Sequence, residues 1–96
     1  MLNIDVLTPE SNIFSGSVLS ISLPGLDGVF QVLPNHTPII SALKQGTIRV
    51  ELTNEFDPEQ FKSKLISTTG DSKKIEITIN GGVAELTNNK MIVLAE

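Results

Sequence analysis

Apolar and polar residues alternate in short runs along most of the chain, and no other property of the sequence limits the fold as strongly. The first run begins almost at the amino terminus, where Leu2, Ile4 and Val6 are separated by Asn3 and Asp5. A period of two places one apolar face on a β-strand. Further alternating runs occupy residues 19–23, 48–52 and 75–79. The pattern predicts an all-β fold.

Turn-forming residues separate these runs. Pro24-Gly25 is expected to interrupt the second run, and Asp27-Gly28 has the form of a tight hairpin turn. Asn88-Asn89 is predicted to supply the left-handed backbone of a closing hairpin. Residues 34–38 form a stiff loop, because prolines at both ends restrict the backbone. Many short strands at close spacing indicate a sandwich or a barrel.

Residues 53–74 form the least strand-like stretch. Within it, Asp57-Pro58-Glu59-Gln60 has an N-cap residue, a first-turn proline and a capping-box glutamine in the right order. This order allows one short helix near residues 58–65.

Length and composition indicate one compact domain over residues 1–96, with 40% hydrophobic and 19% charged residues. A net charge of -4 argues against nucleic acid or an anionic bilayer as a partner. The absence of cysteine excludes disulfides, thiolate metal sites and thiol catalysis. No apolar run approaches the roughly twenty residues that span a bilayer, so direct membrane insertion is not expected.

The chain has little equipment for bond chemistry. His36 is the only histidine, and without a second imidazole or a cysteine it favours a structural or interface role over a metal site. Gly81-Gly82 lacks the spacing of a phosphate-binding loop and indicates a turn or bulge. We therefore expect no catalytic residue, no metal and no cofactor. The stiff loops are either a contact surface or simple hairpin corners, and the residues alone favour neither.

Several elements, taken in their order and spacing, closely resemble the epsilon subunit of F-type ATP synthases. The most specific is Pro34-Asn35-His36-Thr37-Pro38, followed about ten residues later by Gly46-Thr47-Ile48-Arg49. The resemblance runs from end to end and weakens only over residues 53–74. The other matching elements are Thr8-Pro9-Glu10, Phe14-Ser15-Gly16, Leu23-Pro24-Gly25, Gly28, Gly81-Gly82 and Val93-Leu94-Ala95-Glu96.

The resemblance implies a ten-stranded β-sandwich of two antiparallel sheets. It implies a non-catalytic rotor subunit in the central stalk of a proton-translocating ATP synthase, coupling the gamma subunit to the c-subunit ring during ATP synthesis. Its place would be peripheral, on the cytoplasmic side of the bacterial plasma membrane. By position, the gamma contacts would be Thr8, His36 and Ser41, and the ring contacts Leu26, Asp27, Gly28 and Val29.

Three departures from the family pattern stand out. The position of Val29 is often acidic in relatives, and residues 53–74 are longer than the usual connection. Family members usually continue past the position of Ala95-Glu96 into two helices that inhibit ATP hydrolysis, so we expect that inhibitory device to be absent. The alternative function is a small-ligand or carbohydrate-binding module, although a chain without Trp or Tyr is poorly equipped to stack sugars.

Overall fold

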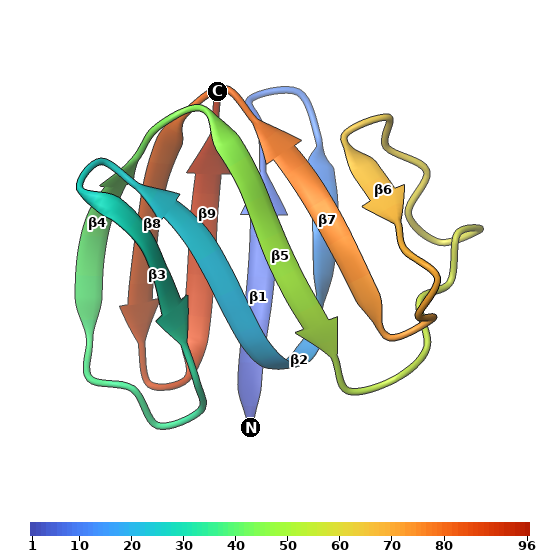
Figure 1. Cartoon of the computed structure of the whole chain (residues 1–96), viewed down its shortest axis with the longest axis horizontal. Coiled ribbons are helices and arrows are strands. Elements are labelled where there is room, and N and C mark those ends of the chain that lie inside the picture. Colours follow the sequence, from blue (N-terminus) through green and yellow to red (C-terminus); the bar gives the residue numbers. More distant parts are fainter.

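The computed structural model describes residues 1–96 and contains nine β-strands and no helix (Figure 1). The all-β prediction is confirmed, with one strand fewer than the ten that the resemblance implies. The strands are β1 (Leu2–Leu7), β2 (Asn12–Gly25), β3 (Gly28–Val32), β4 (Ile39–Leu43), β5 (Gly46–Leu52), β6 (Ile66–Thr68), β7 (Lys74–Ile79), β8 (Gly82–Thr87) and β9 (Lys90–Ala95).

The strands form two layers that face each other. One layer has the order β1-β9-β8-β4, and the other contains β3, β2, β5, β7 and β6, seen in front in Figure 1. The 14-residue β2 joins the layers, because its first half pairs with β1 and its second half pairs with β5 and β3. All pairings are antiparallel except the parallel pairing of β1 with β9. The predicted sandwich is therefore a hydrogen-bonded sheet folded over on itself.

The space between the layers holds one cluster of 21 buried hydrophobic residues. Leu2, Ile4 and Val6 are fully buried, as their alternation with polar residues predicts. Burying a side chain of this size contributes about 1.5–3 kcal/mol relative to leaving it exposed. No polar or charged residue is buried in the core, so strand alternation alone sorts the chain into inside and outside.

The expectation that Pro24 interrupts its strand is wrong, because β2 continues to Gly25. Pro24 is the penultimate residue of the strand, where one missing donor costs little of the ladder. Its carbonyl accepts the N–H of Lys44 at 2.9 Å. Its ring is buried against Gly46, where an added Cβ would come within 2.8 Å of the Pro24 Cβ.

The helix allowed over residues 58–65 does not form. The Asp57 side chain accepts the N–H of Glu59 at 2.9 Å, and the Asp57 carbonyl accepts the N–H of Phe61 at 3.4 Å. This single turn does not propagate, because the Phe61 ring packs on Phe14 with ring centroids 4.9 Å apart. One turn of helix is costly to nucleate, and a core contact that requires another backbone direction prevails.

Candidate functional site

The layer β1-β9-β8-β4 carries apolar side chains on its outer surface. Strand pairing places Ala42, Val83, Leu94 and Leu7 in one row across β4, β8, β9 and β1. Val83 is 44% exposed and Leu94 is 56% exposed, although Val83 lies beside the buried Ala84 and Leu94 lies between two buried residues of its strand. These side chains contribute little to the core, so their apolar character requires another explanation.

A second row extends this surface. Ile40 in β4 lies opposite Glu85 in β8, which lies opposite Ile92 in β9. Ile40 is 75% exposed, among the most exposed large apolar side chains of the chain. We call the two rows together the apolar face. Its apolar members are Leu7, Ile40, Ala42, Val83, Ile92 and Leu94, and its second row also contains the charged residues Glu85 and Asp5. Exposed apolar side chains gathered in this way on one layer are typical of an interaction site.

The opposite outer surface of the molecule has a different character. One row across β3, β2, β5, β7 and β6 is entirely polar, and the Arg49 Nε lies 3.2 Å from the Glu76 Oε2 within it. We call this the polar face, and the members of the row are Gln31, Ser22, Arg49, Glu76 and Ser67. Both layers cover the same core, so the asymmetry is a property of the outer surfaces alone.

The predicted ring contacts lie in the hairpin between β2 and β3. Gly25 pairs with Gly28 and leaves Leu26 and Asp27 as the two loop residues, with Gly28 at a φ of 131° that favours glycine. Leu26 is 62% exposed and Val29 is 66% exposed. The hairpin therefore presents two apolar side chains on either side of one carboxylate.

This hairpin adjoins the apolar face. The N–H of Leu26 donates to the carbonyl of Ala42 at 3.3 Å, which holds the tip against the end of β4. A groove of about 450 Å³ runs between the hairpin and β4, with Ile40 and Ser41 in its lining. Hairpin and apolar face thus form one continuous exposed surface.

The three predicted gamma contacts do not lie together. Thr8 follows the last residue of β1, at the end of the apolar face, and its Oγ1 accepts the N–H of Ser11 at 3.3 Å. His36 is exposed in the loop between β3 and β4, at the opposite end of the molecule (Figure 1). Thr8 and His36 therefore lie toward opposite ends of the β1-β9-β8-β4 layer.

Ser41, the third predicted contact, lies in β4 between two members of the apolar face. Alternation along the strand directs its side chain to the other side, and its Oγ donates to the Ala42 carbonyl at 3.3 Å. It lines the groove beside the β2–β3 hairpin. The structure therefore brings Ser41 to the predicted ring contacts and away from His36.

An ion pair crosses the apolar face between β1 and β9. The Lys90 Nζ lies 2.9 Å from the Asp5 Oδ2, with 28% of the Asp5 side chain exposed. The hydrogen bond from Lys90 lowers the pKa of Asp5 below its ordinary value, assisted by a hydrogen bond with Ser15 and opposed by partial desolvation. Asp5 lies opposite Ile92, so the ion pair and Glu85 are the charged groups within the second row of the apolar face.

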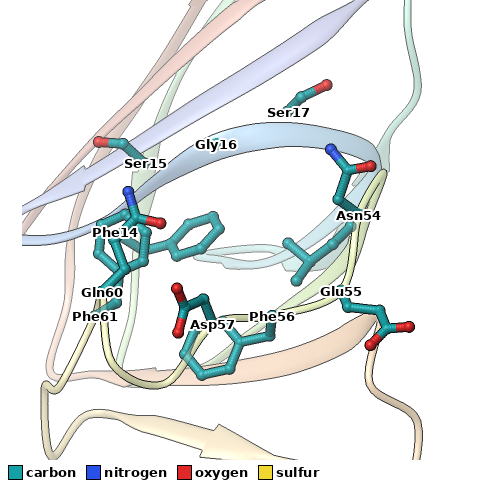
Figure 2. A pocket seen from close by; sticks show the side chains of 11 residues that line it. Phe14, Ser15, Gly16, Ser17, Asn54, Glu55, Phe56, Asp57, Gln60 and Phe61 are labelled. Atoms are coloured by element: carbon teal, nitrogen blue, oxygen red, sulfur yellow. The ribbon is translucent and has the colours of Figure 1, made fainter.

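Figure 2 shows a pocket of about 160 Å³ between the start of β2 and the segment that follows β5. Phe14 forms its floor with Phe61 and with Phe56, whose ring centroid is 6.3 Å from that of Phe14. The Asp57 side chain already accepts a backbone N–H, and no buried side-chain nitrogen or oxygen lacks a hydrogen-bond partner. The pocket is the seam where residues 53–65 close the side of the sandwich.

The structure offers few groups for catalysis or metal binding. The His36 Nδ1 lies 2.7 Å from the Thr37 carbonyl and its ring has no carboxylate partner. No three His, Cys, Asp or Glu side chains gather where they could hold a metal ion. A helix able to cross a membrane is also absent.

Sequence reasoning singled out loops and missed the apolar face. A signal was present in Met91–Leu94, which are four successive apolar residues. Met91 and Val93 face the core, and Ile92 and Leu94 face outward, so both sides of this strand are apolar. Such a run is typical of a strand covered on both sides. Only the register of the strands shows that Val83 and Ala42 continue the same outer row.

Comparison with known proteins agrees with this architecture. Residues 1–61 match the family model for the ATP synthase delta/epsilon chain, beta-sandwich domain. The ATP synthase epsilon chain of Chlorobium limicola is 38% identical over 93 residues, spanning 97% of this chain and 86% of that protein. The epsilon chain of Helicobacter pylori strain 26695 is 34% identical over 96 residues, which span the whole of this chain and 63% of that protein.

Solved structures share the fold at low sequence identity. A chain in the central stalk/c-ring structure of the Tetrahymena thermophila mitochondrial ATP synthase superposes with a TM-score of 0.66 at 12% identity, over 98% of this chain and 62% of that one. A chain of the Euglena gracilis mitochondrial ATP synthase superposes with a TM-score of 0.71 at 17% identity, and the match covers 99% of this chain and 50% of that one. These structures share the fold, and the matched family model and the sequence relatives show that the chain belongs to the ATP synthase epsilon chain family, whose members are non-catalytic subunits of that complex.

Proposed function

We propose that this chain is a central-stalk (rotor) subunit of a proton-translocating F-type ATP synthase, located peripherally on the cytoplasmic side of a bacterial plasma membrane. In this role it couples the gamma subunit to the c-subunit ring during ATP synthesis. The observation that carries the proposal is the apolar face, because the chain exposes a full row of apolar side chains on one layer and a polar row on the other.

The apolar face is the surface proposed to bind gamma. Its central residues Val83 and Leu94 lie on paired strands, so their positions are fixed by the sheet before any partner binds. A rigid surface loses little conformational freedom on docking and transmits force without bending. Thr8 and His36, toward the two ends of this layer, would then contact gamma at the edges of the interface.

The β2–β3 hairpin is the surface proposed to bind the polar loops of the ring. Leu26 and Val29 supply apolar contact area, and the Asp27 carboxylate adds a negative charge to a chain of net charge -4. Basic loops on the ring would complement this charge, which fixes register more than it adds affinity. Ser41 lines the groove beside the hairpin and would therefore lie near this contact as well.

Calorimetric titration of the chain into the gamma subunit of the same organism tests the gamma contact. Calorimetry suits a chain without Trp or Tyr, since it does not depend on aromatic absorbance. We expect a tight one-to-one complex that is weakened by His36→Ala. A flat titration at micromolar concentrations of both proteins would refute the gamma contact.

Capture of the gamma complex on detergent-solubilised c-ring tests the ring contact separately. Asp27→Lys reverses the one charge of the hairpin and is expected to reduce capture. Glu55→Lys is the matched control, because Glu55 is exposed on the segment after β5, away from the hairpin. Equal capture by the two variants would argue against the hairpin as the ring contact.

A further inference from the structure

Two asparagines join the loop between β3 and β4 to the turn between β8 and β9. The N–H of Asn35 donates to the Asn89 Oδ1 at 2.6 Å, and the Asn89 Nδ2 donates to the Asn35 Oδ1 at 3.1 Å. The two residues are 54 positions apart in the sequence. Figure 1 shows the loop and the turn at the same end of the molecule. We call this reciprocal pair the latch.

Both latch residues hold a left-handed backbone. Asn35 has a φ of 68° and Asn89 a φ of 61°, a conformation that asparagine tolerates better than most residues. The turn is anchored in its own right, because the Asn89 carbonyl accepts the N–H of Asn3 at 2.9 Å. The latch therefore ties an exposed loop to a fixed point of the β1-β9-β8-β4 layer.

His36 is the residue that the latch positions. It follows Asn35 directly, and its own N–H donates to the Leu33 carbonyl at 3.2 Å. The Thr37 carbonyl can only accept, so the His36 Nδ1 that lies 2.7 Å from it carries the proton. In the neutral ring this leaves Nε2 as an acceptor on an exposed side chain.

We infer that Asn35 and Asn89 are positioning residues, which hold the loop so that the His36 Nε2 accepts a hydrogen bond from a donor on the partner. This inference rests on the proposed function, since the partner is the gamma subunit bound at the apolar face. A loop fixed before docking loses less freedom on binding than a free loop. The latch thus contributes to affinity without touching the partner.

The experiment removes the latch and keeps the turn. Asn89→Gly deletes both side-chain hydrogen bonds while glycine accepts the same positive φ. Asn88→Gly is the matched control, because Asn88 also has a positive φ, of 50°, and takes no part in the latch. Asn89→Asp is the conservative variant, because its carboxylate can still accept the N–H of Asn35.

Amide hydrogen exchange by NMR reports the latch itself. In Asn89→Gly we expect the Asn35 amide to exchange at least about tenfold faster, with the core amides unchanged. Asn88→Gly should leave the Asn35 amide as it is, and Asn89→Asp should restore most of its protection. Equal exchange in Asn89→Gly and the unchanged chain would overturn the latch.

Affinity for gamma reports the positioning role. We expect Asn89→Gly to weaken binding about three- to tenfold, with Asn88→Gly unchanged and Asn89→Asp close to the unchanged chain. His36→Ala should cost less in the Asn89→Gly background than alone, because the latch acts through His36. Unchanged affinity in Asn89→Gly despite faster exchange, or additive effects of the two changes, would overturn the positioning role. Failure of the unchanged chain to bind gamma would overturn the proposed function, and the exchange data would still decide whether the latch holds the loop.

Discussion

The two outer faces of this sandwich cover the same core and differ in almost every other respect. On the apolar face, Ala42, Val83 and Leu94 meet across three strands. On the polar face, Ser22, Arg49 and Glu76 meet across three strands in the same geometry. Strand pairing and burial of the inward residues are satisfied equally well in both cases.

The difference shows that folding fixes the residue type at inward strand positions but leaves the residue type at outward positions open to selection for binding. An inward residue such as Ile77 is fully buried and must be apolar to exclude water. An outward residue needs only to fit a pleated surface, and polar side chains there keep a protein soluble. Apolar side chains that face outward in a row are therefore best explained by a partner that covers them.

The largest expected effect is a loss of stability from a change that separates β8 from β9 beneath the apolar face. Gly82→Ala would place a Cβ 2.2 Å from the Leu94 carbonyl oxygen, at a φ of 151°. Because β8 must then separate from β9, we expect a loss of about 3 kcal/mol or more in the free energy of unfolding. Urea unfolding followed by far-ultraviolet circular dichroism measures it.

Gly28→Ala is the control for this change. Gly28 also has a positive φ, of 131°, but an added Cβ would meet nothing within 4 Å. Strain without a clash should cost about 1 to 2 kcal/mol. If Gly82→Ala and Gly28→Ala lose the same stability, the loss comes from the positive φ alone, and the close approach of β8 to β9 at Gly82 adds nothing to it.

The next effect separates binding from folding. Leu94→Glu places a charge in the middle of the apolar face, on a side chain that is already 56% exposed. We expect affinity for gamma to fall by at least about 2 kcal/mol, the scale of an interface hot spot, with a much smaller change in stability. Titration calorimetry and urea unfolding of the same variant give the two numbers. Full affinity in Leu94→Glu would remove the apolar face from the proposed interface.

A smaller effect concerns the ion pair in the second row of the apolar face. The pKa of Asp5 is lowered in the folded chain, so its ionised form stabilises the fold above the ordinary carboxyl pKa. That contribution is lost as the pH falls through the lowered pKa, below roughly pH 4. Lys90→Met should remove less than about 1 kcal/mol at neutral pH and flatten the loss of stability on acidification.

Thermal unfolding measured between neutral and acidic pH distinguishes this pair from other charges. Lys62→Met is the control, since Lys62 pairs with Glu59 on an exposed loop outside both faces. The control should keep the slope of the unchanged chain through the acidic range. A slope that is the same in Lys90→Met would show that Lys90 does not set the pKa of Asp5.

The smallest effect is expected on the polar face. Arg49→Leu makes one of its positions apolar and breaks an ion pair whose two side chains are 60% and 38% exposed. Exposed pairs of this kind contribute about 0.2–1 kcal/mol, so stability should change by no more than that. Affinity for gamma should stay within about twofold, since the polar face is not proposed to contact it. Weaker binding of gamma by Arg49→Leu would contradict the proposal that only the apolar face contacts gamma.

Much of the fold follows from the sequence, because it depends on local pattern. Alternation in residues 2–6, 48–52 and 75–79 predicts strands that the structure contains as β1, β5 and β7. The Asn88-Asn89 turn was predicted from the tolerance of asparagine for left-handed backbone, and both residues have positive φ. Such features require only neighbours in the sequence.

The remaining features depend on contacts between distant residues. The helix-start pattern at Asp57 produces a single turn in the structure, and the contact between Phe61 and Phe14 then directs the chain away from a helix. The sequence signals the apolar face only in Met91–Leu94, and its extent could not be predicted because Ala42 and Val83 become neighbours only through strand register. The proposed contact residues came from resemblance, which assigns positions without showing that Ser41 and His36 face different parts of the surface.

The parallel pairing of β1 with β9 has a consequence for how the protein is made. The β9 residues Lys90–Ala95 lie between β1 and β8, so the ninth strand is a central strand of the layer that the first strand begins. During synthesis the preceding strands emerge with a gap where β9 belongs, and pairings between distant segments are slow to form. The ribosome must therefore release the chain as far as β9 before this layer can close, and the exposed edges of β1 and β8 are vulnerable to aggregation until then.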